Sequence, residues 1–152
     1  MFSLFPKKEM LPKDAQQRIV ESIKQAESKT SGEIRVFMEH HCQYIDPLHR
    51  AQEIFAELGM EKTVARNAII IYIALTDRQF ALYGDKVIYE KAGGAAFWQE
   101  AAAMLTGHLK KNEVAEGVSN CIQELGMALA THFPYDSAIK KNELPDEIVF
   151  GK

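Results

Sequence analysis

The fold is decided by residues 67–85, which run Asn67-Ala-Ile-Ile-Ile-Tyr-Ile-Ala-Leu-Thr-Asp77-Arg78-Gln79-Phe-Ala-Leu-Tyr-Gly84-Asp85. The run from Ala68 to Leu75 is apolar on both faces, which predicts a central strand covered on both sides. The polar break at Thr76-Asp77-Arg78 is short, so the run from Gln79 to Tyr83 should pair antiparallel to the first. The stretch therefore predicts a hairpin at the centre of a sheet.

The residues before this hairpin predict a helix, a strand and a second helix. Apolar residues recur at helical spacing from Ile19 to Ala26, and Glu33 to Met38 follows as a strand. Asp46 suits the N-cap of the next helix and Pro47 its first turn. Because strand–helix–strand connections are right-handed crossovers, the strands on either side of this helix should be parallel.

Two more helices should follow the hairpin, one around Phe97-Trp98 and one from Val114 to Leu129, before Pro134 blocks continuation. Helices alternating with strands in this order predict an α/β fold, a three-layer α/β/α sandwich with a small mixed sheet.

The length of 152 residues predicts one domain with its own core. We expect a flexible N-terminal segment at residues 1–12, the domain at 13–134 and a C-terminal tail at 135–152. The tail carries apolar residues between Leu144 and Phe150 that can dock on the body.

Composition excludes several classes of protein. The 18 basic and 21 acidic side chains give a net charge of −3, without the basic stripe that nucleic-acid binding requires. Cys42 and Cys121 lack the spacing of a disulfide framework. No segment has the length or apolar character of a signal peptide or a membrane helix. We therefore expect a cytoplasmic protein without membrane insertion, and nothing in the sequence indicates an obligate oligomer.

Strand direction places Glu33, Arg66, Asn67 and Asp85 at one end of the sheet. Carboxylate and amide oxygens suit a hard cation, so Glu33, Asn67 and Asp85 are the candidate ligands of Ca²⁺ or Mg²⁺. The planar guanidinium of Arg66 is the candidate binder of phosphate oxygens. The alternative is that Glu33 is solvated, Asp85 caps a turn and Arg66 forms an ion pair.

The opposite end of the sheet carries His40-His41-Cys42, Asp46 and His49, residue types that also bind transition metals. Ligands of open α/β sheets bind beyond the carboxyl ends of parallel strands, which favours this end. However, adjacent strand residues point to opposite faces, so His40 and His41 cannot both be ligands without a bend. We therefore prefer the end that holds Glu33 and Asp85.

Several short segments resemble the TPM domain family, which includes a thylakoid-lumen acid phosphatase, a photosystem II repair protein and a modulator of an acetylcholine receptor. They are Ser31-Gly32-Glu33-Ile34, the strand from Asn67, Asp77-Arg78, Gly84-Asp85 and Gly93-Gly94. The resemblance implies a compact α/β sandwich and covers roughly Ala15 to Pro134. Many relatives carry glycine where this chain has Ala68 and Lys86, and many are exported or tethered to membranes.

The sequence has no Gly-x-Ser-x-Gly elbow and no Cys–His pair placed as a nucleophile, so its catalytic residues are unknown. The first hypothesis is a TPM-like module that binds a divalent cation or a protein partner of unknown identity. The alternative is a metal-assisted phosphatase that hydrolyses phosphate monoesters, an activity implied by the family resemblance.

Overall fold

The computed structural model describes residues 11–139 and 146–151 of the chain. Its elements, in chain order, are α1 (Lys13–Glu27), β1 (Glu33–Glu39), α2 (Pro47–Glu57), the 3₁₀ turn η1 (Met60–Lys62), β2 (Ala68–Ala74), β3 (Gln79–Gly84), α3 (Lys86–Lys91), α4 (Ala95–Lys110), α5 (Val114–His132) and β4 (Val149–Phe150).

The strands form one mixed sheet in the order β3-β2-β1-β4. β1 and β2 are parallel, with Glu33 opposite Ala68, and β3 runs antiparallel to β2, with Gly84 opposite Ile69. The predicted crossover and hairpin are therefore confirmed. At the other edge, β4 pairs parallel to β1, with Val149 opposite Phe37.

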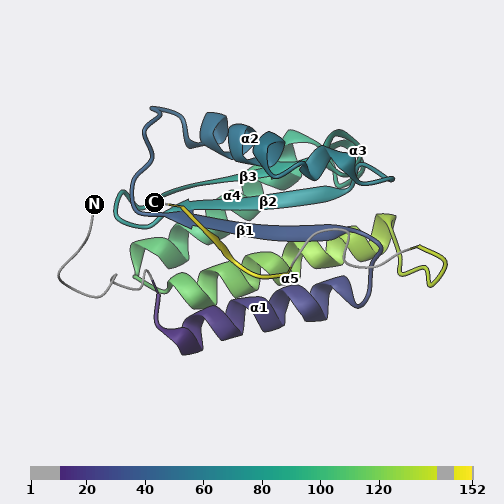
Figure 1. Ribbon diagram of the computed structural model, residues 1–152, viewed down its shortest axis with the longest axis horizontal. Coiled ribbons are helices and arrows are strands. Elements are labelled where there is room, and N and C mark those ends of the chain that lie inside the picture. The colour runs from purple at the N-terminus through teal and green to yellow at the C-terminus, as the bar shows by residue number, and fades with distance from the viewer. Residues whose placement is uncertain (1–10, 140–145, 152) are drawn as a thin grey trace.

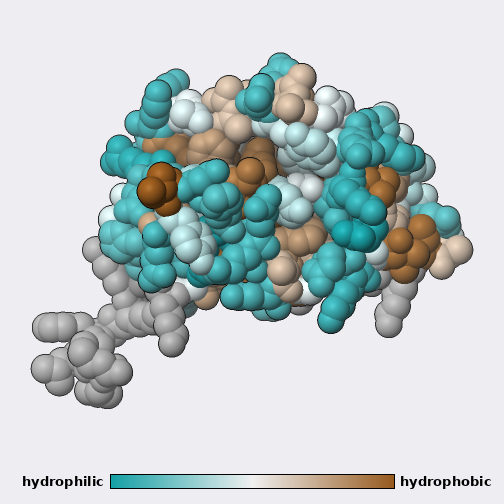
Figure 2. All heavy atoms as spheres, turned by 90° about the horizontal axis from the view of Figure 1, so that it is seen from above, coloured by the Kyte–Doolittle hydropathy of each residue, from teal (hydrophilic) through white to brown (hydrophobic). Residues whose placement is uncertain are grey.

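Helices cover both faces of the sheet, and Figure 1 shows α2 on one side and α1 and α5 on the other. β2 is buried along its whole length, because Ile69, Ile71 and Ile73 pack among the helices α1, α4 and α5. Its alternate residues, such as Ile70 and Tyr72, pack under α2. The three-layer α/β/α sandwich predicted from the sequence is confirmed. Seen from the α2 side, apolar side chains lie in recesses between polar ones (Figure 2).

Local signals account for the ends of several elements. The Asp46 side chain caps α2 by accepting a hydrogen bond from the backbone N–H of Leu48 at 2.9 Å. Arg78 has φ 55°, the left-handed conformation that the tight turn between β2 and β3 requires. None of the described helices is both long and apolar enough to cross a membrane.

Three elements were not predicted, namely η1, α3 and β4. The six residues Lys86–Lys91 form α3, which is too short to show an apolar period. β4 has only two residues, and a run of that length has no sequence signature of its own. Residues 1–10 of the expected N-terminal segment, and Leu144 in the tail, lie outside the described residues.

Candidate functional site

Arg66 and Asp85 form an ion pair at the end of the sheet that the sequence favoured. Arg66 Nε donates to Asp85 Oδ2 at 2.6 Å, and Arg66 Nη2 donates to Asp85 Oδ1 at 2.8 Å. Oδ1 also accepts from the backbone N–H of Lys86 at 2.8 Å and so caps α3. This arrangement raises the pKa of Arg66, mainly through the hydrogen bonds to Asp85. The Asp85 side chain is 3% exposed and that of Arg66 is 39% exposed.

Glu33 and Asn67 lie at the same end, and each is 2% exposed. Glu33, Ala68 and Asp85 follow one another across three neighbouring strand positions, because Glu33 pairs with Ala68 and Asp85 N donates to Ala68 O at 2.9 Å. Two strand spacings separate the α-carbons of Glu33 and Asp85 by about 10 Å. Of the alternative expected for this end, the solvated Glu33 is wrong, because Glu33 is buried, whereas the ion pair of Arg66 and the capping role of Asp85 are confirmed.

The side-chain amide of Asn67 lacks a hydrogen bond. Its Nδ2 is buried and has no hydrogen-bond partner among the described residues. A buried amide group without a partner costs free energy comparable to a lost hydrogen bond. Because the two ends of an asparagine amide have nearly the same shape, rotation by 180° puts an oxygen ligand in the same position.

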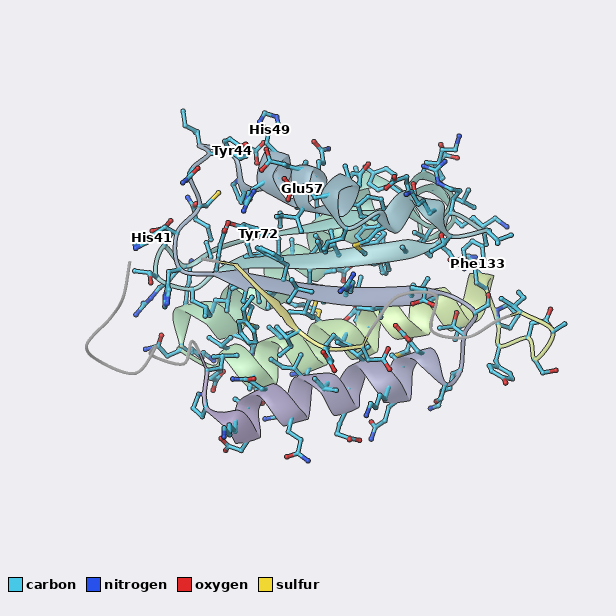
Figure 3. All side chains as sticks on the ribbon, viewed as in Figure 1. His41, Tyr44, His49, Glu57, Tyr72 and Phe133 are labelled. Carbon is cyan, nitrogen blue, oxygen red and sulfur yellow. The ribbon has the colours of Figure 1, made fainter. Side chains whose placement is uncertain are left out.

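The opposite end of the sheet separates its candidate ligands. His40 Nδ1 lies 3.3 Å from Thr76 Oγ1, whereas His41 Nδ1 lies 2.9 Å from Asp77 Oδ1. His41 lies beyond the end of β1 and the exposed His49 lies on α2, at separate places on the surface (Figure 3). Asp77 is also bonded to the backbone N–H of Cys42 at 2.7 Å. These residues close the β2–β3 turn against the loop after β1.

A buried network under α2 was missed from the sequence. Arg50 donates from Nε and Nη2 to the two carboxylate oxygens of Glu39, at 2.9 and 3.0 Å, and the Tyr72 hydroxyl also donates to Glu39. Glu39 is 5% exposed and Tyr72 is fully buried. Burial and the carboxylate raise the pKa of Tyr72. The available signal was strand alternation, which places Glu39 on the same face as Phe37.

A second missed group joins α4 to α5. His108 Nδ1 lies 3.1 Å from Glu113 Oε1, and His108 Nε2 lies 3.3 Å from Asn120 Nδ2. Within the described ranges, His108, Glu113 and Glu116 form the one group of three His, Cys, Asp or Glu side chains whose ligand atoms lie within 4.8 Å of one another. Both ring nitrogens of His108 have protein partners, which accounts for its orientation without an ion.

A third missed group lies at the edge of β1, where Glu27 meets Asp146. Glu27 Oε2 accepts from the backbone N–H of Ile34 at 2.9 Å, and its carboxyl group hydrogen-bonds with that of Asp146. Two carboxyl groups can share a hydrogen bond only if one holds a proton. Burial, followed by this contact, raises the pKa of Glu27 to about 9.

Comparison with known proteins identifies the family. The sequence model of the TPM domain matches residues 5–128. The chain belongs to the TPM domain family. It is similar to the BA42 protein of the psychrophilic bacterium Bizionia argentinensis, whose NMR structure superposes with a TM-score of 0.85 at 35% identity, covering 95% of this chain and 97% of that one.

A more distant solved structure shares the fold. The N-terminal domain of the cg2496 protein from Corynebacterium glutamicum has a TM-score of 0.59 at 14% identity, with 95% of both chains covered. No curated protein matches this chain. The family and the α/β sandwich are thus shown, and the predicted resemblance to TPM domains is confirmed.

Proposed function

We propose that this TPM domain is a divalent-cation-binding module that holds Ca²⁺ or Mg²⁺ with Glu33, Asn67 and Asp85. The observation that carries the proposal is the burial of these three polar residues at one end of the sheet, each 2% exposed. Their oxygen atoms are the ligand type that hard cations require. Asn67, whose buried Nδ2 has no partner among the described residues, would join the set by turning its amide oxygen toward the ion.

The backbone register of the sheet supports the grouping of the two carboxylates. Glu33 and Asp85 occupy the positions on either side of Ala68, about 10 Å apart at their α-carbons, on the same face of the sheet. Ca²⁺ accepts oxygen ligands at about 2.3–2.6 Å, so binding requires both carboxylates to turn toward the same ion. Arg66 holds Asp85 as an internal cation. An ion must displace it or share the carboxylate.

A titration with CaCl₂ or MgCl₂, followed by backbone amide NMR, tests the proposal. We expect the amides of Glu33, Asn67 and Asp85 to shift first and to saturate together. Glu33→Gln should weaken binding at least about tenfold, because it removes one ligand charge. A first response at His40 and His49, or at His108, would contradict the assignment.

The matched control is Asp46→Asn. It removes one carboxylate charge at the opposite end of the sheet but keeps the side-chain oxygen that caps α2. Cation affinity in this variant should stay within about twofold of the parent.

The proposal also places the domain in the cytoplasm, where the free thiols of Cys42 and Cys121 stay reduced.

A second candidate function is metal-assisted phosphate monoester hydrolysis, favoured by the exposure of Arg66. Asp85 uses Nε and Nη2 of the guanidinium, so Nη1 remains to donate to a phosphate oxygen. A bound cation would act as a Lewis acid and activate water. Hydrolysis of p-nitrophenyl phosphate with Mg²⁺, Mn²⁺ or Ca²⁺ tests this function. Activity that Asp85→Asn leaves unchanged would exclude the proposed site.

A further inference from the structure

The two edges of the sheet differ in whether another strand covers them. At the β1 edge, the chain adds its own strand: β4 pairs with Phe37 and Met38, and Gly151 N donates to Met38 O at 2.7 Å. At the other edge, no strand of the described chain pairs with the outer side of β3. β3 also lacks the lysine, proline and charged residues that usually protect an exposed edge. This edge is therefore open to pairing.

The outward backbone groups of β3 can be assigned. Asp85 N donates to Ala68 O, which fixes the phase of the antiparallel ladder. Ala81 and Tyr83 therefore bond toward β2, whereas the N–H and C=O groups of Phe80, Leu82 and Gly84 point away from the sheet. None of these three outward residues makes a backbone bond to a loop or helix within the described part of the chain. An occupant must supply alternating donors and acceptors, which an extended polypeptide does.

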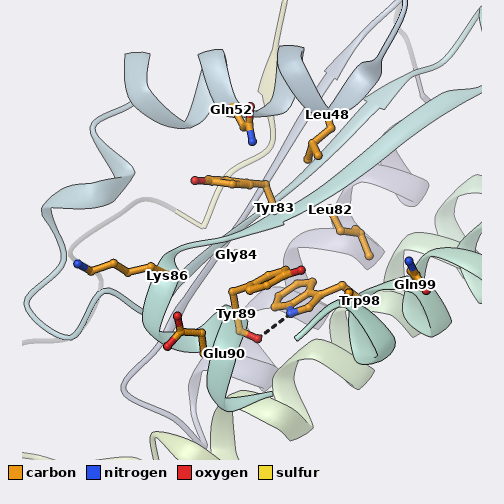
Figure 4. A pocket seen from close by; sticks show the side chains of 11 residues that line it. Leu48, Gln52, Leu82, Tyr83, Gly84, Lys86, Tyr89, Glu90, Trp98 and Gln99 are labelled. Carbon is orange, nitrogen blue, oxygen red and sulfur yellow. Dashed lines mark hydrogen bonds between the residues drawn. The ribbon is translucent and has the colours of Figure 1, made fainter. Parts of the chain in front are cut away.

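A groove of about 470 Å³ runs along this edge. Its floor is β3 at Leu82–Gly84, and Figure 4 shows Leu48 and Gln52 of α2 on one side and Trp98 on the other. The groove therefore has the edge strand as its base and a wall of side chains on each side. A single added strand fits this shape, because its side chains alternate between the two walls. The edge of a second folded domain carries its own helices, which would meet these walls.

The wall formed by α3 and α4 is aromatic, and its two rings are held in place by contacts with each other. The rings of Tyr89 and Trp98 stack with centroids 5.9 Å apart, and Trp98 Nε1 donates to Tyr89 O at 3.2 Å. A Cβ on Gly84 would lie 2.7 Å from the Trp98 ring, so glycine permits this ring to lie against the edge strand. Aromatic side chains supply large, rigid contact area for an apolar residue of a partner.

The charge distribution of the groove also favours an extended polypeptide segment. Among its described lining residues, Lys86 and Glu90 carry the charges, one of each sign, and both lie at the α3 end. The remaining lining is apolar, aromatic or amide. An uncharged apolar segment therefore matches the lining along β3. Charged residues of the partner would lie at the end near α3. A single lysine balanced by a glutamate disfavours a nucleic acid or a polyphosphate.

We propose that the β3 groove binds an extended segment of a partner protein, which adds to β3 as a fifth strand and places an apolar side chain against Trp98. The proposal goes beyond cation binding and uses other atoms, namely the outward backbone of β3 and the aromatic wall. Loss of cation binding in Glu33→Gln therefore leaves it standing, and failure of peptide binding leaves the cation site standing.

Selection from a displayed random heptapeptide library against the full chain provides the probe. We expect peptides with apolar residues at alternate positions, and the best of them, synthesised with blocked ends, should shift the amides of Phe80, Leu82 and Gly84. N-methylation of alternate residues should abolish binding when it removes the N–H groups that face β3. Selection without such peptides, or equal binding of every methylated form, overturns the proposal.

Two variants of the groove and one control complete the test. Leu82→Pro removes an outward N–H that β2 does not use, and Tyr89→Ala removes the half-exposed ring of the aromatic wall. Each should weaken the peptide at least about tenfold, while Tyr135→Ala, which removes a tyrosine outside the groove, should change affinity less than about twofold. If Leu82→Pro unfolds, Tyr89→Ala decides alone. A dimer in sedimentation that Tyr89→Ala dissociates would make a second copy the occupant and overturn the proposal.

Discussion

Arg66 binds Asp85 through two parallel hydrogen bonds, from Nε to Oδ2 at 2.6 Å and from Nη2 to Oδ1 at 2.8 Å. The guanidinium therefore occupies the carboxylate that the proposed cation would bind. The same carboxylate caps α3 through Lys86 N, so one side chain connects the β2 entry loop, the end of β3 and the start of α3.

Removing this internal cation should strengthen the binding of an external one. In Arg66→Gln, Asp85 keeps its cap on α3 but loses its positive partner, so Ca²⁺ should bind at least about tenfold more tightly. Calorimetric titration measures the change. Arg78→Gln is the control, because Arg78 is exposed at the opposite end of the sheet and shares the positive φ of Arg66, 55° against 52°. Equal or weaker binding in Arg66→Gln would remove Asp85 from the ligand set.

Substitution of Asp85 should separate its capping role from its charge. Asp85→Ala removes the acceptor for Lys86 N and should lower the free energy of unfolding by about 1–2 kcal/mol. Asp85→Asn keeps an oxygen cap and should lower it less, while it removes the charge that pairs with Arg66. Urea unfolding at pH 7 measures both. Equal losses would show that the cap contributes nothing.

The network under α2 should be intolerant of losing one partner. Arg50→Ala leaves the carboxylate of Glu39, whose side chain is 7% exposed, without its bidentate donor. We expect a loss of about 3 kcal/mol in unfolding free energy. The double variant Arg50→Met with Glu39→Gln should recover part of this loss, because it removes both charges. A double variant as unstable as Arg50→Ala would show that the guanidinium over the Phe37 ring, whose Cζ lies 5.8 Å from the ring centroid, dominates instead of the charge pair.

Stability should fall as pH rises from about 5 to 9 because of Glu27. Its pKa is about 9 in the folded chain, raised by burial and by the hydrogen bond to Asp146, against 4.5 ordinarily. Between these values the folded state binds one proton more than the unfolded state, so the free energy of unfolding decreases with pH. The slope from this group is at most about 1.4 kcal/mol per pH unit.

Glu27→Gln tests this dependence. Glutamine stays neutral, accepts from Ile34 N and can donate to Asp146, so the variant should show a flatter decline in urea midpoint between pH 6 and pH 8.5. Glu57→Gln is a control, because Glu57 ends α2 and is exposed. Parallel pH profiles in Glu27→Gln and the parent would exclude Glu27 as the titrating group.

The sequence by itself determined the centre of the fold. Eight apolar residues from Ala68 to Leu75 have to be covered on both faces, and the short break at Asp77-Arg78 allows only an antiparallel return. Because these signals depend only on residues that are neighbours in the chain, they can be read without knowledge of the tertiary structure. The same reasoning placed Glu33, Arg66, Asn67 and Asp85 at one end of the sheet.

Only the tertiary structure decided which polar groups meet and which surfaces remain open. Alternation predicts the face on which Glu39 lies, but the covering helix decides that Arg50 is its partner. Glu27 lies within a helical pattern, and its pKa is raised because the fold buries it and brings the distant Asp146 to its carboxyl group. Likewise, β4 covers one edge of the sheet and leaves β3 open. A pattern fixes the direction of a side chain, whereas its charge, burial and partner depend on elements far away in the chain.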